Sequence, residues 1–273
     1  MLETPSGKNA DTENFPVGSF LLPKPLRPHV ARFYNFARAI DDIADNPELT
    51  PEVKIARLEA FGVAVTDGSD DPELATAHLL SVSLKETNVP PQHCLDLISA
   101  FKQDAVQPRY KTWEDLIDYC QRSAAPVGRY LLDLHGEDKA LYPAADALSN
   151  ALQVINHLQD VSDDYAEMDR VYVPTDWLEA QSLDVTAIDA PATSPELRKV
   201  FDRMLGGTED LLAISKTLAP AMQNKHLRAE TRVIQKIAET LTKRLYAGDP
   251  IATRIKLSKP AAAMTAIRGL LRL

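Results

Sequence analysis

The stretch RPHVARFYNFARAIDDIAD, residues 27–45, carries apolar side chains at the spacing of one face of an α-helix. They recur every three or four residues, as a helix with a buried face requires, at Val30, Phe33, Phe36, Ala37 and Ile40. A proline at position 28 suits the first helical turn, where a backbone N–H has no internal partner. The stretch therefore predicts an amphipathic helix that packs against a core.

The same pattern continues outward along the chain, in runs separated by prolines. Further helices are predicted over residues 50–65, 71–87, 90–106, 112–136, 142 to about 168, 194–220 and 230–248. No run alternates in the manner of a strand over more than a few residues. These patterns predict an all-α protein of roughly eight to ten helices, packed as an orthogonal or bundle-like domain.

The composition is that of an ordinary globular protein. Of 273 residues, 45% are hydrophobic and 25% are charged. No low-complexity linker interrupts the chain, which favours one domain over residues 1–273, with a flexible start at 1–13 and an amphipathic tail at 260–273. The net charge of −9 argues against a nucleic-acid partner. Cys94 and Cys120 offer no disulfide framework, and no signal peptide or membrane-spanning run is evident, so a cytoplasmic location is expected.

Two of the predicted helices carry polar side chains in a narrow stripe. At about 100° per residue, offsets of 0, 3 or 4, 7 and 11 fall on one side of a helix. In the first helix these positions are Tyr34, Arg38, Asp41 and Asp45. In the second helix they are Gln153, Asn156, Asp160 and Asp164. Each stripe therefore ends in two aspartates about one turn apart.

Paired aspartates on an apolar helix can indicate a solvated face or a cation site. Like charges four residues apart cost a helix roughly 0.2–0.5 kcal/mol, and a bound cation would offset this repulsion. Ligands that are all oxygen favour a hard ion, and Mg²⁺ binds through one or two carboxylates together with substrate phosphates. A di-iron site would require Glu-x-x-His pairs, which the sequence lacks.

In these residues the chain resembles the squalene and phytoene synthases, whose two aspartate-rich motifs bind diphosphate through Mg²⁺. The resemblance is carried by DDIAD at 41–45, QVINHLQDVSDD at 153–164 and DRVYVP at 169–174. It extends to NFPVGSFLLP at 14–23, YNFAR at 34–38 and DYCQRSAAPVGRYLL at 118–132, and covers most of the chain. It implies an isoprenoid-synthase-type helical fold with a central pocket.

Three features resemble one branch of that family. They are the NFPVGS segment, a proline at 126 in the tunnel helix, and Gln159 where most head-to-head synthases carry arginine. In bacterial hopanoid biosynthesis this branch converts presqualene diphosphate and water to hydroxysqualene and diphosphate. One alternative is a head-to-head prenyl synthase that makes presqualene diphosphate, dehydrosqualene or phytoene. Another is a non-catalytic prenyl-lipid-binding assembly factor, which would be expected to lose motif aspartates.

The resemblance also implies roles for particular residues. For roughly two or three Mg²⁺ ions, the implied ligands are Asp41, Asp45, Asp160 and Asp164, with Asn156 as a further candidate. The catalytic candidates are Arg38, Tyr34, Tyr119, Arg170, Tyr172 and Gln159. The substrate-binding candidates are Asn14, Phe15, Gln153, Asn156, Ser123, Ala124, Val127 and Gly128. Asp104 is a candidate support for Arg38. The alternatives are structural: packed aromatics at 119 and 172, a helix end at 170, and close helix packing at the small residues.

The branch also implies partners. Its reaction ends in water capture, so no NADPH is expected, and a C30 product must reach a bilayer or be handed to other squalene-pathway enzymes. From residue 225 onward the chain has eleven Lys/Arg against three Asp/Glu, and AAAMTAIRGLLRL at 261–273 is amphipathic. Such a basic end suits peripheral contact with the anionic inner face of the plasma membrane. An equal alternative is a final helix that packs on an acidic face of the core.

Overall fold

The computed structural model describes residues 21–270, and within that range the chain is helical without strands. An isolated bridge joins Arg109 to Val171. The α-helices are α1 (Arg27–Asp45), α2 (Pro51–Asp67), α3 (Ala75–Thr87), α4 (Gln92–Asp104), α5 (Trp113–Ser123), α6 (Ala125–Leu134), α7 (Tyr142–Gln159), α8 (Val161–Met168), α9 (Thr175–Glu179), α10 (Pro195–Ser215), α11 (Leu218–Ala221), α12 (Lys225–Ala247) and α13 (Lys259–Leu270). Short 3-10 turns lie at Lys24–Leu26, Pro72–Leu74, Lys139–Leu141 and Val185–Asp189. The predicted all-α fold class is confirmed.

Prolines begin many of these helices, as the sequence predicted. A proline occupies the first or second position of α1, α2, α6, α7 and α10. Three predicted helices are nevertheless interrupted, and one of them, the run at 194–220, divides into α10 and α11 at residues 216–217. The run at 112–136 divides into α5 and α6 at Ala124, because Pro126 has no N–H to continue the earlier helix. The run at 142–168 divides into α7 and α8 at Asp160, where no proline marks the break.

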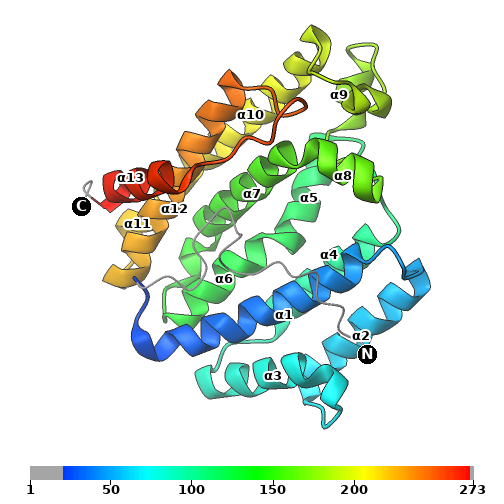
Figure 1. Ribbon diagram of the computed structural model, residues 1–273. Coiled ribbons are helices and arrows are strands. Elements are labelled where there is room, and N and C mark those ends of the chain that lie inside the picture. The colour runs from blue at the N-terminus through cyan, green and yellow to red at the C-terminus, as the bar shows by residue number, and fades with distance from the viewer. Residues whose placement is uncertain (1–20, 271–273) are drawn as a thin grey trace.

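The helices pack around α7 (Figure 1). On one side, α5 and α6 separate α7 from α1, and α2 and α3 lie beyond α1. On the other side, α10 and α12 pack on α7, and α13 packs on α12. The core contains large side chains that are fully buried, among them Phe36 and Phe61 from α1 and α2 and Phe201 from α10. This arrangement brings one face each of α1, α6, α7 and α12 toward a shared interior space.

The final described helix, α13, lies against α12 rather than extending away from it. Gly269 allows the close approach, since a Cβ there would lie 3.0 Å from the Cα of Val233. Thr265 is also buried at this contact, whereas Met264 and Ile267 are exposed. Within residues 21–270, no helix combines the length and the apolar character that crossing a membrane requires.

Candidate active site

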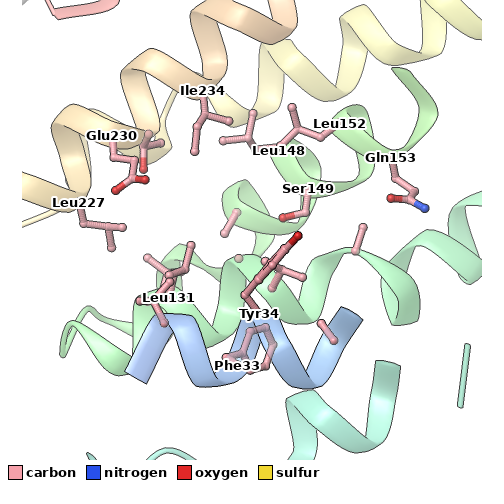
Figure 2. Close-up of a pocket in the computed structure, with 18 of the residues that line it drawn as sticks. Phe33, Tyr34, Leu131, Leu148, Ser149, Leu152, Gln153, Leu227, Glu230 and Ile234 are labelled. Atoms are coloured by element: carbon pink, nitrogen blue, oxygen red, sulfur yellow. The ribbon is translucent and has the colours of Figure 1, made fainter. Parts of the chain in front are cut away.

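A cavity of about 360 Å³ lies between α1, α6, α7 and α12. Most of its wall is apolar, and Figure 2 shows Leu131, Leu148, Leu152 and Ile234 around the space. One end is polar. The side chains there come from the two predicted stripes and are Tyr34, Arg38, Asp41, Gln153 and Asn156.

The stripe on α1 forms as predicted, because the helix runs unbroken to Asp45. Arg38 lies between two aspartates of the same helix. Its Nη2 pairs with Asp41, and its Nε donates to Asp42 Oδ1 at 2.9 Å. Asp42 is buried, with 7% of its surface exposed, so it fixes Arg38 from behind while Asp41 lines the cavity.

Asp45 lies one helical turn beyond Asp41 and is held by Arg170. Arg170 Nη1 donates to Asp45 Oδ1 at 2.5 Å, and Nη2 donates to the carbonyl of Ala44 at 2.9 Å. Burial alone would lower the pKa of this guanidinium, but the acidic groups around it, Tyr172 first among them, raise the pKa above its usual range. Arg170 therefore stays charged and connects the segment after α8 to the end of α1.

The second stripe does not lie on one helix, and that expectation was wrong. Gln153 and Asn156 face the cavity from α7, but the helix ends before Asp160, whose φ of −107° and ψ of 9° depart from helical values. Asp164 lies one turn further along, on α8, and its N–H donates to the carbonyl of Asp160 at 2.8 Å. Both aspartates are half-buried, at the end of α7 that carries the polar cavity wall.

Sequence reasoning missed Arg254, which pairs with Asp160. Its Nε lies 2.6 Å from Asp160 Oδ1, and its Nη2 donates to Oδ2 at 3.0 Å. Arg254 belongs to the non-helical segment between α12 and α13, so no helical spacing relates it to either motif. Its distance of 94 residues from Asp160 leaves no local signal in the sequence.

Gln159 does not line the cavity, which corrects the expectation that it faces the substrate. Its side chain is buried, and its amide donates to the carbonyl of Ile255, the residue after Arg254. Because α7 carries Asn156 toward the cavity, a residue three positions later on the same helix is turned about 60° away. Gln159 instead positions the segment that supplies Arg254 to Asp160.

Tyr119 and Tyr172 do not line the cavity either. They are packed aromatic side chains, which was the structural alternative given for both positions. Their hydroxyls donate to Asp104, from Tyr119 at 2.6 Å and from Tyr172 at 3.3 Å. Burial raises the pKa of Asp104 to about 6, although Arg170 acts in the opposite direction. The expected support of Arg38 by Asp104 is therefore replaced by an electrostatic contact with Arg170. Tyr172 also stacks on His157, with ring centroids 3.6 Å apart.

The four small residues of the predicted tunnel helix all line the cavity, and they are Ser123, Ala124, Val127 and Gly128. Gly128 serves close packing as well, because a Cβ there would lie 2.7 Å from Ser149 Oγ on α7. These small residues therefore line the cavity, as the resemblance implied, and Gly128 also permits close helix packing. The two remaining substrate-binding candidates, Asn14 and Phe15, lie outside the described residues.

The polar end suits a divalent cation that arrives with a diphosphate. Within residues 21–270, no three His, Cys, Asp or Glu side chains converge into a ready metal cluster, since arginines pair with Asp41, Asp45 and Asp160. The available donors are carboxylate and amide oxygens, which Mg²⁺ accepts together with phosphate oxygens. Three guanidinium groups beside the same carboxylates supply positive charge for the phosphates themselves.

Comparison with known proteins identifies the family. The family model described as squalene/phytoene synthase matches residues 9–261. The chain is 40% identical over 257 residues to the hydroxysqualene synthase of Zymomonas mobilis, covering 93% of this chain and 86% of that protein. It is 38% identical over 267 residues to the hydroxysqualene synthase of Rhodopseudomonas palustris, covering 98% and 90%.

A solved structure agrees with these matches. The crystal structure of squalene synthase HpnC from Alicyclobacillus acidocaldarius aligns with a TM-score of 0.74 at 29% identity, covering 83% of this chain and 85% of that one. Likeness over nearly the whole chain therefore accompanies an apolar cavity whose polar end is lined by Asp41 of the first motif and by Gln153 and Asn156 of the second. The chain belongs to the squalene/phytoene synthase family.

Proposed function

We propose that the protein is a hydroxysqualene synthase, which converts presqualene diphosphate and water to hydroxysqualene and diphosphate. The relatives from Zymomonas mobilis and Rhodopseudomonas palustris, which carry that name, support this activity. The observation that carries the proposal is the cavity itself, with an apolar wall along its length and charge at one end. This cavity matches a substrate that has a long hydrocarbon part and a diphosphate at one end.

The diphosphate binds at the polar end in this proposal. Arg38 and Arg254 offer guanidinium groups for the phosphate oxygens, and the buried Arg170 adds a fixed positive charge nearby. Bound Mg²⁺ would neutralise the diphosphate as a leaving group. The residues proposed to hold it are Asp41, Asp45, Asp160 and Asp164, with Asn156 as a further ligand.

The hydrocarbon part occupies the apolar wall, which controls what happens after the diphosphate leaves. Leu131, Leu148 and Ile234 exclude bulk water, so the carbocation rearranges before a nucleophile reaches it. The ring of Tyr34 lies beside this space in Figure 2, where an aromatic face stabilises positive charge. The remaining requirement is one water molecule delivered to one carbon.

The reaction itself tests the proposal. Purified protein with presqualene diphosphate and Mg²⁺ should release diphosphate and form hydroxysqualene, whose hydroxyl carries the label from ¹⁸O-water. Added NADPH should not change the product, and a chelator should stop the reaction. The proposal fails if the protein ignores presqualene diphosphate yet condenses farnesyl or geranylgeranyl diphosphate, or if squalene forms only with NADPH.

A further inference from the structure

A buried hydroxyl belongs to the cavity wall next to the polar end. Ser123, the last residue of α5, is 8% exposed and lines the cavity. Within residues 21–270 its Oγ has no hydrogen-bond partner. Buried polar atoms in proteins are nearly always paired, so this hydroxyl requires a partner other than the described side chains and backbone.

Other buried hydroxyls of this protein are paired within their own helices. Thr208 Oγ1 donates to the carbonyl of Met204 at 2.9 Å, and Thr242 Oγ1 donates to the carbonyl of Ala238 at 2.9 Å. A serine that only filled space at the end of α5 could make the same bond to a carbonyl one turn earlier. Ser123 does not make it, so its hydroxyl remains available to a molecule in the cavity.

The wall also carries two neutral polar groups on α7, the hydroxyl of Ser149 and the amide of Gln153. They are four residues apart and therefore share one face of the helix. Figure 2 shows Ser149 pointing toward Tyr34, with Gln153 farther along the same helix.

The packing of α6 on α7 places Ser123 level with these two groups. Gly128 lies against Ser149, since a Cβ at Gly128 would be 2.7 Å from Ser149 Oγ. Helices α6 and α7 are joined by the short connection 135–141 and pack on one another, so they run in opposite directions. One turn back from Gly128 toward Ser123 therefore corresponds to one turn forward from Ser149 toward Gln153.

This section of the cavity adjoins the place where the carbocation forms. Asn156, at the polar end, is seven residues from Ser149, which is about 10 Å along α7, and Gln153 lies between them. Beyond Ser149 the wall continues with Leu148 and Ala145, which are apolar. The hydroxyl and amide groups therefore face the carbon atoms next to the departing diphosphate rather than the far end of the hydrocarbon.

We propose that Ser123 holds the water molecule that captures the rearranged carbocation, with Ser149 and Gln153 as further hydrogen-bond partners of that water. This inference rests on the proposed function and assigns its final step to residues. A buried water in a protein makes about three hydrogen bonds, which two hydroxyls and one amide can supply.

The proton that the water loses must pass beyond these groups, because a hydroxyl and an amide are neutral donors and acceptors. A lone pair of the water oxygen forms the new C–O bond, one O–H bond breaks, and the proton passes to an oxygen of the released diphosphate at the polar end. The sum of the reaction remains one diphosphate displaced by one water.

A held water also decides between competing products. A carbocation with no water in reach loses a proton from a neighbouring carbon and gives an alkene. A water fixed at one place along the cavity favours the alcohol and determines which carbon receives the hydroxyl. Ser123 therefore determines the product and has no part in the departure of the diphosphate.

The test separates ionisation from capture in Ser123→Ala, which removes one oxygen atom. With presqualene diphosphate and Mg²⁺, diphosphate release should stay close to the wild-type rate. The ratio of hydroxysqualene to hydrocarbon products should fall about tenfold, the effect of losing one hydrogen bond to the water.

The matched control is Ser81→Ala. Ser81 on α3 is 1% exposed, and within residues 21–270 its Oγ likewise has no hydrogen-bond partner, but it does not line the cavity. This substitution should leave both diphosphate release and the product ratio unchanged.

Each outcome bears on a different statement. An unchanged product ratio in a folded Ser123→Ala protein overturns the role of Ser123 and leaves the proposed function intact. Equal loss of diphosphate release and alcohol, with no new hydrocarbon, also overturns it in favour of a packing role. If the wild-type protein releases no diphosphate, the proposed function fails and this inference with it. Should Ser123→Ala not fold, Ser149→Ala tests the same water from α7, and an unchanged product ratio there likewise contradicts the proposal.

Discussion

At the polar end of the cavity, buried residues that do not line it hold the motif aspartates in place. Asp104 does not line the cavity, yet it accepts hydrogen bonds from Tyr119 and Tyr172 and lies in the electrostatic surroundings of Arg170. Arg170 in turn holds Asp45 and the Ala44 carbonyl at the end of α1. Buried contacts that run from Asp104 through Arg170 thus hold Asp45 in place, and they come from segments outside α1.

Asp104 also gives the protein a measurable pH dependence. Because its pKa is raised to about 6 from 3.8, the folded state binds the proton more tightly than the unfolded state. The stability that Asp104 contributes is therefore fully present below pH 3.8 and is lost as the pH rises through about 6. Relative to Asp104→Asn, the wild-type free energy of unfolding should decrease by roughly 2 kcal/mol between pH 4 and pH 6. Urea titrations at several pH values measure this difference, and a constant difference would contradict it.

Asp41 is expected to matter for activity far more than for folding. Asp41→Asn should abolish diphosphate release, since the substitution removes a proposed metal ligand. Loss of the partly buried pair with Arg38 should lower stability without metal by about 1 kcal/mol. Asp118→Asn is the matched control, because Asp118 pairs with Arg122 on α5 away from the cavity wall. Near-normal Mg²⁺-dependent turnover in Asp41→Asn would refute the proposed site.

At the scale of elements, the break between α7 and α8 and the segment between α12 and α13 form one unit. The break places Asp160 at the end of α7, and the segment delivers Arg254 to it. Gln159 joins the two by donating to the Ile255 carbonyl. A glutamine immediately before the aspartate therefore positions a distant arginine, and the cation at this site comes from another part of the chain.

Gln159→Leu tests this connection. The substitution removes the hydrogen bond to Ile255 and should lower stability by about 1 kcal/mol. It should raise the KM for presqualene diphosphate more than it lowers kcat, because Arg254 would no longer be held in place. In a double-mutant cycle with Arg254→Gln, the two effects should be far from additive, since both act through one segment. Additive effects would mean that Gln159 does not act through Arg254.

Over the whole molecule, charge is distributed unevenly. The net charge is −9, although residues from 225 onward contain eleven Lys/Arg against three Asp/Glu. On α13, within that basic part, Met264 and Ile267 are 55% and 56% exposed. Packing on α12 therefore leaves an apolar surface next to basic residues, the combination that suits the surface of an anionic membrane.

Vesicle binding tests that surface. The wild-type protein should co-sediment with vesicles that contain anionic lipid, less so at high salt, and Met264→Ser with Ile267→Ser should weaken binding. Leu79→Ser is the control, because Leu79 on α3 is 51% exposed but lies outside the basic part of the chain. Equal binding by all three proteins would remove the membrane role.

The sequence by itself determined the features that repeat locally. Helical periodicity predicted most of the helices and brought Tyr34, Arg38 and Asp41 onto one face, because 3.6 residues per turn fix which side chains share a side. The same rule placed Gln153 and Asn156 at the cavity. Motif order identified the family, since it depends on sequence alone.

Only the tertiary structure decided the contacts between distant segments. The pairs of Asp45 with Arg170 and of Asp160 with Arg254 join residues 125 and 94 positions apart, and no periodicity relates them. The place of Ser123 is of the same kind. At the end of α5 it is indistinguishable from a small residue that permits close packing until α1, α7 and α12 close around that end, because a cavity wall is a property of packed elements and not of any one of them.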